Sequence, residues 1–269
     1  MHLKITSKQN PKIKDLVRLQ TKSKERIEQG QFVIEGVKET RMAIENDYEI
    51  LAAYYCKEIA DKQEINLILS TLSTETLIYE VDKEIYSKIS YRNSTIGLIA
   101  VAKSKLVDLV EVKLSANPLL LVLEKVEKPG NIGAMLRTAD AAAMDAVIIC
   151  DSLTDLYNPN VIRSSVGCVF STQVVLSDSD SVQQWLKQQK ITPYTMSLQA
   201  ESWYYENDFT NPTAFVMGTE SIGLSTIWQE NTDCKLIKIP MQGKNDSLNV
   251  STSAAIAVFE AKRQRNFIL

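Results

Sequence analysis

The chain has 269 residues, of which 45% are hydrophobic and 23% are charged, and its formal net charge is −3. These values are typical of a soluble globular protein with room for one large or two small domains. No apolar run approaches the roughly 18 residues of a membrane span, and the first residues lack the apolar core of a signal peptide, so we expect a cytoplasmic protein.

Cysteine and histidine usage excludes several kinds of chemistry. The four cysteines lie far apart and form no CxxC pair, which favours buried free thiols over a zinc site or a disulfide framework; they are Cys56, Cys150, Cys168 and Cys234. The one histidine of the sequence, His2, lies beside the terminus. We therefore expect no bound metal and no histidine acting as a general base.

The first 26 residues carry a local excess of positive charge, with eight Lys or Arg residues against two acidic ones. Within them, NPKIKDLVRLQ predicts a helix that Asn10 caps, with an apolar stripe on one face. Lys12, Lys14 and Arg18 lie on the other face. This basic face fits either a solvated surface or a patch that contacts RNA phosphates, in which case these three cations bind RNA.

Strands that alternate with helices predict a small α/β domain over residues 1–105. The expected strands are 31–36, 49–56, 76–81 and 96–103, and the expected helices between them are 37–46, 61–73 and 82–90. The alternation of strands and helices then stops, and the Asn117-Pro118 pair is a turn signal at the end of this stretch. We therefore place a linker at residues 106–117.

A second alternation predicts an α/β domain with an open, mostly parallel sheet over residues 118–269. Its expected strands are 119–124, 145–150, 173–176, 191–197, 214–218 and 236–240, and its expected helices are 131–144, 158–167, 180–189 and 249–264. The last helix presents small side chains on one face, Ala254, Ala257 and Ala261, which allow close approach to other backbone segments.

Four segments are expected at the carboxyl ends of these strands, where parallel sheets bind ligands. They are EKVEKPGNIGAMLR, SLQAE, GTESIGLS and MQGKNDSLN. GNIG does not complete the GxGxxG of a dinucleotide site, and GKN does not match the GK[ST] of a P-loop. An enzyme that uses ATP or a dinucleotide is therefore disfavoured.

Taken together, these segments resemble the motifs of the SpoU-like (TrmH) family of RNA ribose 2′-O-methyltransferases, part of the knotted methyltransferase class. The stretches that carry the resemblance are NIGAMLRTA, NPNVIRSSVG, VMGTESIGLS and IPMQGKNDSLNVSTSAA, in the family's order. The first domain is similar to the family's RNA substrate-binding module, which is related to ribosomal proteins, through FVIEG and IGLIAV. Ala143, Thr219 and Ser253 depart from the family pattern, each as a small replacement outside the catalytic positions.

The resemblance implies that S-adenosylmethionine is the cofactor and that the loops of a deep trefoil knot hold it. The residues implied to bind it are Gly218, Ile239, Met241, Leu248, Ser197 and Leu198. The resemblance also implies a homodimer and a reaction that needs no metal.

The same resemblance implies that Arg137 activates the attacking ribose hydroxyl, with Asn131, Glu220, Ser247 and Asn249 holding the arginine and the ribose in place. A guanidinium is a poor base, so Arg137 is better described as orienting the hydroxyl and stabilising developing negative charge. Simpler explanations exist for each residue alone. Asn249 fits an N-cap, Glu220 a surface carboxylate, Arg137 a solvent-facing side chain, and the loop glycines a turn.

We expect the methyl acceptor to be 23S ribosomal RNA, because an additional amino-terminal domain is typical of the family's ribosomal RNA modifiers. The alternatives are a tRNA 2′-O-methyltransferase, an inactive RNA-binding or ribosome-assembly protein, and an α/β enzyme acting on a small nucleotide. Residues 117–269 hold 12 Lys or Arg against 16 Asp or Glu, so phosphate affinity should come mainly from the first domain. Arg163 is a further predicted RNA contact, unless it pairs with Asp151 or Asp155.

Overall fold

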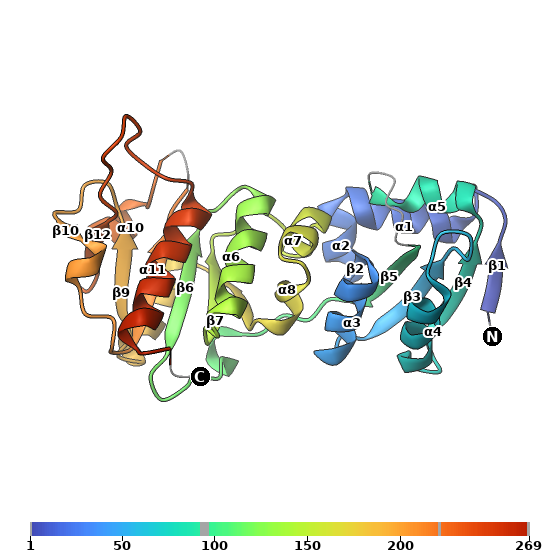
Figure 1. Ribbon diagram of the computed structural model, residues 1–269, viewed down its shortest axis with the longest axis horizontal. Coiled ribbons are helices and arrows are strands. Elements are labelled where there is room, and N and C mark those ends of the chain that lie inside the picture. Colours follow the sequence, from blue (N-terminus) through green and yellow to red (C-terminus); the bar gives the residue numbers. More distant parts are fainter. Residues whose placement is uncertain (1, 92–96, 220–221, 268–269) are drawn as a thin grey trace. The chain divides into compact units, whose positions relative to one another are not determined.

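The structure is a computed structural model that describes residues 2–91, 97–219 and 222–267 (Figure 1). The chain separates into two compact units. The N-terminal unit comprises Met1–Lys105 with Asp155–Ser171, and the C-terminal unit comprises Leu106–Thr154 with Thr172–Leu269. The sequence did not predict that residues 155–171 would group with the N-terminal unit.

The sheet of the N-terminal unit is mixed, with the strand order β1-β4-β3-β5-β2. Its strands are β1 (His2–Ile5), β2 (Gln31–Glu35), β3 (Ile50–Tyr55), β4 (Leu77–Val81) and β5 (Leu98–Lys103). Its helices are α1 (Pro11–Thr21), α2 (Ser23–Gln29), α3 (Val37–Glu45), α4 (Lys62–Thr71), α5 (Lys83–Ile89), α7 (Pro159–Ser164) and α8 (Cys168–Ser171). All the expected strands and helices of this region are present, whereas β1, α2 and α8 were not predicted.

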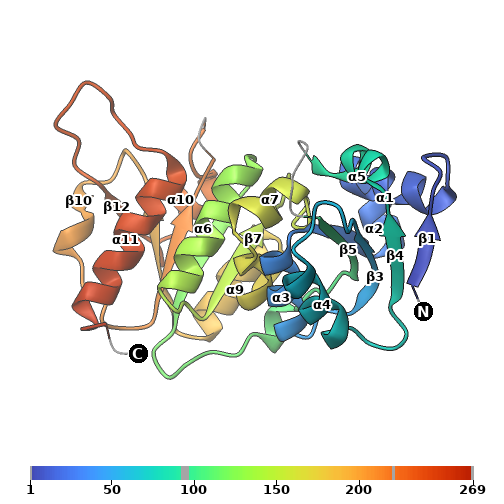
Figure 2. The ribbon, with the colours of Figure 1, turned by 45° about the vertical axis from the view of Figure 1, so that its right-hand side comes forward.

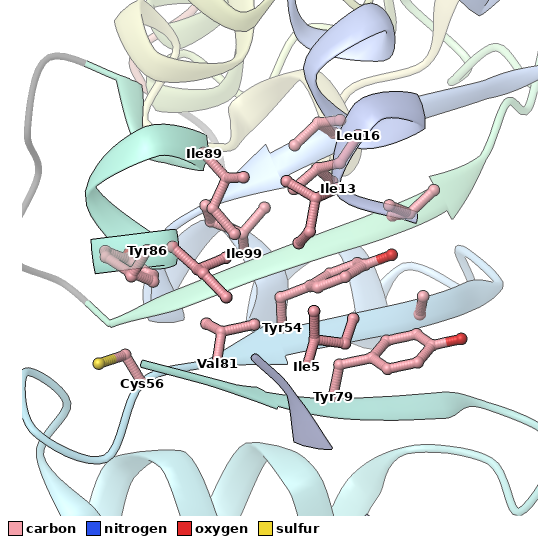
Figure 3. Packing of buried hydrophobic residues seen from close by; sticks show 14 of the residues in the cluster. Ile5, Ile13, Leu16, Tyr54, Cys56, Tyr79, Val81, Tyr86, Ile89 and Ile99 are labelled. Carbon is pink, nitrogen blue, oxygen red and sulfur yellow. The ribbon is translucent and has the colours of Figure 1, made fainter. Parts of the chain in front are cut away.

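Residues that alternate along these strands build a core on each face of the sheet. On one face, Ile13 and Leu16 of α1 and Tyr86 and Ile89 of α5 cluster over Tyr54 of β3 (Figure 3). Helices α3 and α4 cover the opposite face. Helix α1 is thus fixed through its apolar stripe, which leaves its basic face outside the core.

Helix α1 has the predicted cap and the predicted division of faces. The side chain of Asn10 accepts a hydrogen bond from the backbone N–H of Lys12 at 2.9 Å. Lys12, Lys14 and Arg18 are all exposed. Arg18 also pairs with Asp15 at 3.3 Å, an exposed contact that contributes little to stability.

Arg26, which belongs to the basic amino-terminal stretch, has a structural role. Its side chain is 4% exposed, forms an ion pair with Asp155 and donates a hydrogen bond to the carbonyl of Leu19 at 2.5 Å. Nearby, the ring of Tyr157 stacks on Phe32 with 4.0 Å between ring centroids. The segment that contains Asp155 and Tyr157 therefore completes the core of the N-terminal unit, and Arg26 is unavailable to RNA.

The C-terminal unit contains the predicted open sheet, and all its strand pairs are parallel in the order β10-β12-β9-β11-β6-β7-β8. The strands are β6 (Leu119–Glu124), β7 (Ala146–Cys150), β8 (Val174–Ser177), β9 (Thr192–Met196), β10 (Ser202–Trp203), β11 (Thr213–Met217) and β12 (Lys235–Lys238). The helices are α6 (Pro129–Ala141), α9 (Ser179–Gln188), α10 (Thr226–Gln229) and α11 (Val250–Gln264). The strand order reverses between β6 and β11, which is where such sheets bind ligands.

Helices α6 and α11 lie side by side on one face of this sheet in both views (Figures 1 and 2). On the other face, residues of α9 and α10 share a core cluster with β6, β7 and β8. The small side chains predicted on the last helix, Ala254, Ala257 and Ala261, are all fully buried. Because they are small, α11 can lie close to α6 and β11.

The carboxyl end of α11 is fastened by one guanidinium. Arg265 donates hydrogen bonds to the carbonyls of Phe209 and Asn117, both at 2.8 Å, and to those of Pro118 and Asn211. Partial burial lowers the pKa of Arg265 from its ordinary value. This one side chain therefore connects the end of the last helix to the chain segments that precede β6 and β11.

We predict that Arg265→Met lowers the free energy of unfolding by about 1–3 kcal/mol, because hydrogen bonds from a charged donor are lost and carbonyls are left unpaired. Urea titration followed by circular dichroism measures the change. The matched control is Arg263→Met, whose guanidinium pairs with Glu260 at 2.8 Å but is 66% exposed, and which should destabilise the protein much less because exposed ion pairs contribute little. Equal effects of the two variants would contradict the role of Arg265.

Candidate functional site

A pocket of about 560 Å³ opens at the carboxyl ends of β9, β11 and β12, beside the start of α11. Parallel sheets bind ligands at this edge, and the volume lies within the range of small-molecule sites. The six residues predicted to bind the cofactor all line it: Gly218, Ile239, Met241, Leu248, Ser197 and Leu198. With Lys128 also in the lining, all four segments singled out in the sequence meet at this pocket.

The loop after β11 forms one wall, and its shape depends on glycine. Thr219 and Gly223 exchange two backbone hydrogen bonds of 3.0 and 3.1 Å, which narrow the base of the loop. We call this narrow base the neck and residues 218–224 the neck loop. A Cβ atom on Gly218 would lie 2.4 Å from the carbonyl carbon of Gly223 and 2.5 Å from the backbone nitrogen of Leu224. These neighbours are backbone atoms that cannot move aside cheaply. Gly218 is therefore required for close packing of the neck, and Gly223, with φ +76°, for the turn itself.

Apolar side chains around the pocket remain open to solvent. Leu198, Ile222 and Leu248 all line it and are 56%, 84% and 42% exposed. The loop that carries Leu198 is fastened at its base, where the N–H of Ser197 donates to the carbonyl of Ile237 at 3.0 Å. The pocket thus offers apolar surface on fixed loops, as a flat heterocycle such as adenine requires.

Asn249 caps the last helix and also contacts a second residue of the predicted site. Its side-chain oxygen accepts from the N–H of Ser251 at 3.0 Å, so it is the N-cap of α11. Its amide nitrogen donates to the side-chain oxygen of Asn131, 3.2 Å away at the start of α6. Ser247 lies two residues earlier, in the pocket lining, where its hydroxyl donates to Asp246 at 2.9 Å. The structure therefore places Ser247 and Asn249 in the pocket lining and brings Asn131 into contact with Asn249.

The remaining predicted catalytic residues are not gathered at this rim. Arg137 is exposed on α6, about 9 Å further along the helix axis than Asn131, and it is not among the residues that line the pocket. Within the described ranges it forms no ion pair. Glu220 lies outside the described residues.

The predicted RNA contacts are exposed in the N-terminal unit. Lys12, Lys14 and Arg18 lie on α1, and Arg163 lies on α7. The two carboxylates considered as partners for Arg163 have other partners. Asp155 pairs with Arg26, and Asp151 accepts a hydrogen bond from Ser179 at 2.7 Å.

Three charged residues at the site escaped the sequence analysis. Lys128 and Lys238 line the pocket, and the Lys238 ammonium lies 4.8 Å from the ring centre of Trp203, a cation–π contact. Glu124 is 1% exposed at the end of β6 and contacts Ser225, directly after the neck loop. The signal that could have revealed Glu124 is a single charge at the end of an otherwise apolar strand, in LLLVLE. Lys238 ends β12, whose sequence KLIK has a lysine at each end and gives no such signal.

No group of three or more His, Cys, Asp or Glu side chains could hold a metal ion in the described part of the chain. Over the same residues, none of the helices is both long enough and apolar enough to span a membrane.

Comparison with protein families gives two matches that follow one another along the chain. Residues 118–259 match the model described as the SpoU rRNA Methylase family. Residues 10–100 match the model described as the MRM3-like substrate binding domain. The first match contains β6, the pocket loops and most of α11.

Several known proteins are similar over nearly the whole chain. The 23S rRNA (guanosine(2553)-2'-O)-methyltransferase RlmP of Bacillus subtilis is 33% identical over 96% of this chain and 98% of its own length. A crystal structure of an RNA 2'-O ribose methyltransferase is 38% identical, with a TM-score of 0.84, and the match covers 98% of this chain and 100% of that one. The AdoMet-bound rRNA methyltransferase from Sinorhizobium meliloti is 25% identical, with a TM-score of 0.89, over 97% and 98% of the two chains.

Proposed function

The chain belongs to the SpoU rRNA methylase family, and from this premise we propose that it transfers a methyl group from S-adenosylmethionine to a ribose 2′-hydroxyl of 23S ribosomal RNA. The comparisons confirm the family, the enzyme class and the cofactor predicted from the sequence. The observation that carries the proposal is the pocket at the sheet edge, where all four motif segments meet.

The residues present fit the cofactor. Leu198, Ile222 and Leu248 offer apolar contacts for an adenine ring, and the narrow neck at Gly218 lets backbone groups approach the ligand closely. When bound, S-adenosylmethionine supplies a methyl group on a sulfonium, which is already a reactive donor. The protein's contribution is then to position the ribose hydroxyl in line with that methyl group and to exclude competing reactions.

We propose that Asn131, Ser247 and Asn249 hold the ribose at the pocket rim. The hydrogen bond between the two asparagines fixes the start of α6 against the start of α11, so these side chains are already positioned when the ribose binds. Arg137 orients the attacking hydroxyl and stabilises the negative charge that develops on its oxygen. Arg137 is exposed and has no ion-pair partner among the described residues, so its guanidinium is accessible to the substrate. Both properties support this role. Glu220 is proposed to assist from the neck loop.

We also propose that the C-terminal unit contains a deep trefoil knot. Strand β12 lies inside the sheet between β10 and β9, and the loop after it leads back to α11, which packs on α6 and β11. This path is consistent with a chain in which α11 passes through an earlier loop. Such a knot is an exception to the rule that protein chains are not knotted. The fully buried alanines of α11 support such threading because they allow close packing.

We further propose that the protein works as a homodimer. Phe259 of α11 is 41% exposed, and Ile256 on the same helix is only half-buried, so α11 presents apolar surface on the side away from its sheet. Burial of this surface against a second copy would remove it from water. A ribosomal RNA substrate also supports the predicted cytoplasmic location.

RNA affinity is proposed to come largely from the basic face of α1. We predict that a triple substitution of Lys12, Lys14 and Arg18 to Gln reduces the slope of log affinity against log salt by about 2, since each phosphate contact contributes roughly 0.7–0.9. Filter binding over a salt series measures it. Lys38 and Arg41 are exposed on α3, on the opposite face of the sheet, and their substitution to Gln is the matched control. An unchanged slope in the triple variant would remove α1 from the RNA interface.

The proposal is tested by offering three acceptors to the purified protein with labelled S-adenosylmethionine: protein-free 23S rRNA, assembled large ribosomal subunits and bulk tRNA, all from cells that lack the protein. Labelling of the rRNA, free or assembled, is expected. Labelling of tRNA alone would favour the tRNA alternative. Saturable cofactor binding without transfer to any of the three would favour a non-catalytic RNA-binding protein.

A further inference from the structure

We infer that Glu124 is a positioning residue that sets the shape of the cofactor pocket by holding Ser225. Glu124 ends β6, the strand beside the point where the strand order reverses. Ser225 follows the neck loop directly and is the N-cap of α10. The inference rests on the proposed function, since it concerns the pocket assigned above to S-adenosylmethionine.

The contact between the two residues is bidentate, and it joins a buried carboxylate to a half-buried serine. One carboxylate oxygen of Glu124 accepts from the N–H of Ser225 at 2.8 Å, and the other accepts from its hydroxyl. The glutamate side chain is 1% exposed, and the nearest ammonium, that of Lys125, lies 3.9 Å away. A buried carboxylate is costly unless its oxygens accept hydrogen bonds or pair with a cation. Here both oxygens are used by a single residue.

Two sets of hydrogen bonds hold the neck loop, and the contact between Glu124 and Ser225 is the second. The first is the pair of backbone hydrogen bonds between Thr219 and Gly223. Leu224 follows and is buried in the core under the sheet, and Ser225 is then held by Glu124. The residues of this loop that line the pocket are Gly218, Thr219, Ile222, Gly223 and Leu224. Release of Ser225 therefore changes the wall of the pocket and not a distant surface.

The chemistry of the contact distinguishes two substitutions. Glutamine keeps the shape, and its amide oxygen can accept from the N–H of Ser225 while its amide nitrogen donates to the hydroxyl. Methionine keeps a similar volume but offers no comparable acceptor, so the N–H of half-buried Ser225 loses its partner. A role in positioning predicts that glutamine rescues cofactor binding and methionine does not.

The test is isothermal titration of S-adenosylmethionine into the full-length protein. Glu124→Met should raise Kd at least about tenfold, and Glu124→Gln should stay within about threefold of the wild type, because only methionine leaves the donor unpaired. Ser225→Ala, which keeps the N–H and removes only the hydroxyl, should raise Kd about fivefold, more than Glu124→Gln does. This variant decides the question if Glu124→Met does not fold.

The matched control is a carboxylate that holds the opposite end of β6. Asp145, the residue before β7, accepts from the N–H groups of Ser115 and of Leu119, the first residue of β6, at 2.5 and 2.8 Å. Asp145→Ala should lower the melting temperature and leave Kd unchanged. The inference is overturned if Glu124→Met or Ser225→Ala binds as the wild type does, or if Asp145→Ala weakens binding equally. Absence of saturable binding by the wild type would instead overturn the proposed function.

Discussion

Replacing Arg137 with lysine is expected to lower kcat by about 100- to 1,000-fold, the usual effect of removing a group that stabilises charge in the transition state. Lysine keeps the positive charge but loses the planar fork that can hold a hydroxyl and a phosphate together. Arg137 is exposed on α6 and does not line the pocket, so the Kd for S-adenosylmethionine should not change. The experiment is a single-turnover assay with a saturating concentration of labelled cofactor.

A lysine substitution of another exposed arginine in the C-terminal unit controls for general effects. Arg263 lies on α11 and pairs with Glu260 at 2.8 Å, so Arg263→Lys should retain nearly full activity. Near-normal turnover by Arg137→Lys would show that charge alone suffices and that the orienting role is wrong. A loss of cofactor affinity in that variant would instead indicate that Arg137 supports the pocket.

Replacing Gly218 with alanine is expected to weaken cofactor binding by at least about 100-fold, roughly 2.7 kcal/mol. The added methyl carbon would lie 2.4 Å from the carbonyl carbon and 2.5 Å from the carbonyl oxygen of Gly223. Relief requires the hydrogen-bonded neck between Thr219 and Gly223 to open, which moves the wall of the pocket. Isothermal titration with S-adenosylmethionine measures the loss.

Gly243 provides the matched glycine for this experiment. It lies in the loop between β12 and α11, and a Cβ atom built on it meets nothing within 4 Å. Gly243→Ala should therefore bind the cofactor like the wild type. Wild-type affinity in Gly218→Ala would mean that the neck is not part of the cofactor site, and equal losses in both variants would point to general sensitivity of the loops.

The sequence predicted the elements whose signals are local. Asn10 and Asn249 cap their helices as expected, and the apolar run of β6 is fully buried at the centre of the parallel sheet. Strand β1 was missed because it is short and mostly exposed, and it is a strand only through its pairing with β4. Helix α2 was missed because its sequence, SKERIEQ, has no apolar stripe and its one buried residue is Arg26.

What the sequence could not predict depends on partners that are distant along the chain. Arg26 looked like one more surface cation, yet it is buried against Asp155, 129 residues away. Glu124 looked like the end of a strand, yet it holds Ser225, 101 residues later. The loops of the pocket were predicted from the family's motifs, whereas these supporting contacts exist only once the chain has folded.

The central claim is that the methyl group goes to a ribose oxygen, and nucleoside analysis tests it most directly. RNA from cells that lack the protein is incubated with S-adenosylmethionine and either the wild type or Arg137→Ala, digested to nucleosides and examined by mass spectrometry. We predict one 2′-O-methylnucleoside that increases with the wild type and not with the variant. A base-methylated nucleoside, or the same product from both proteins, would contradict the account.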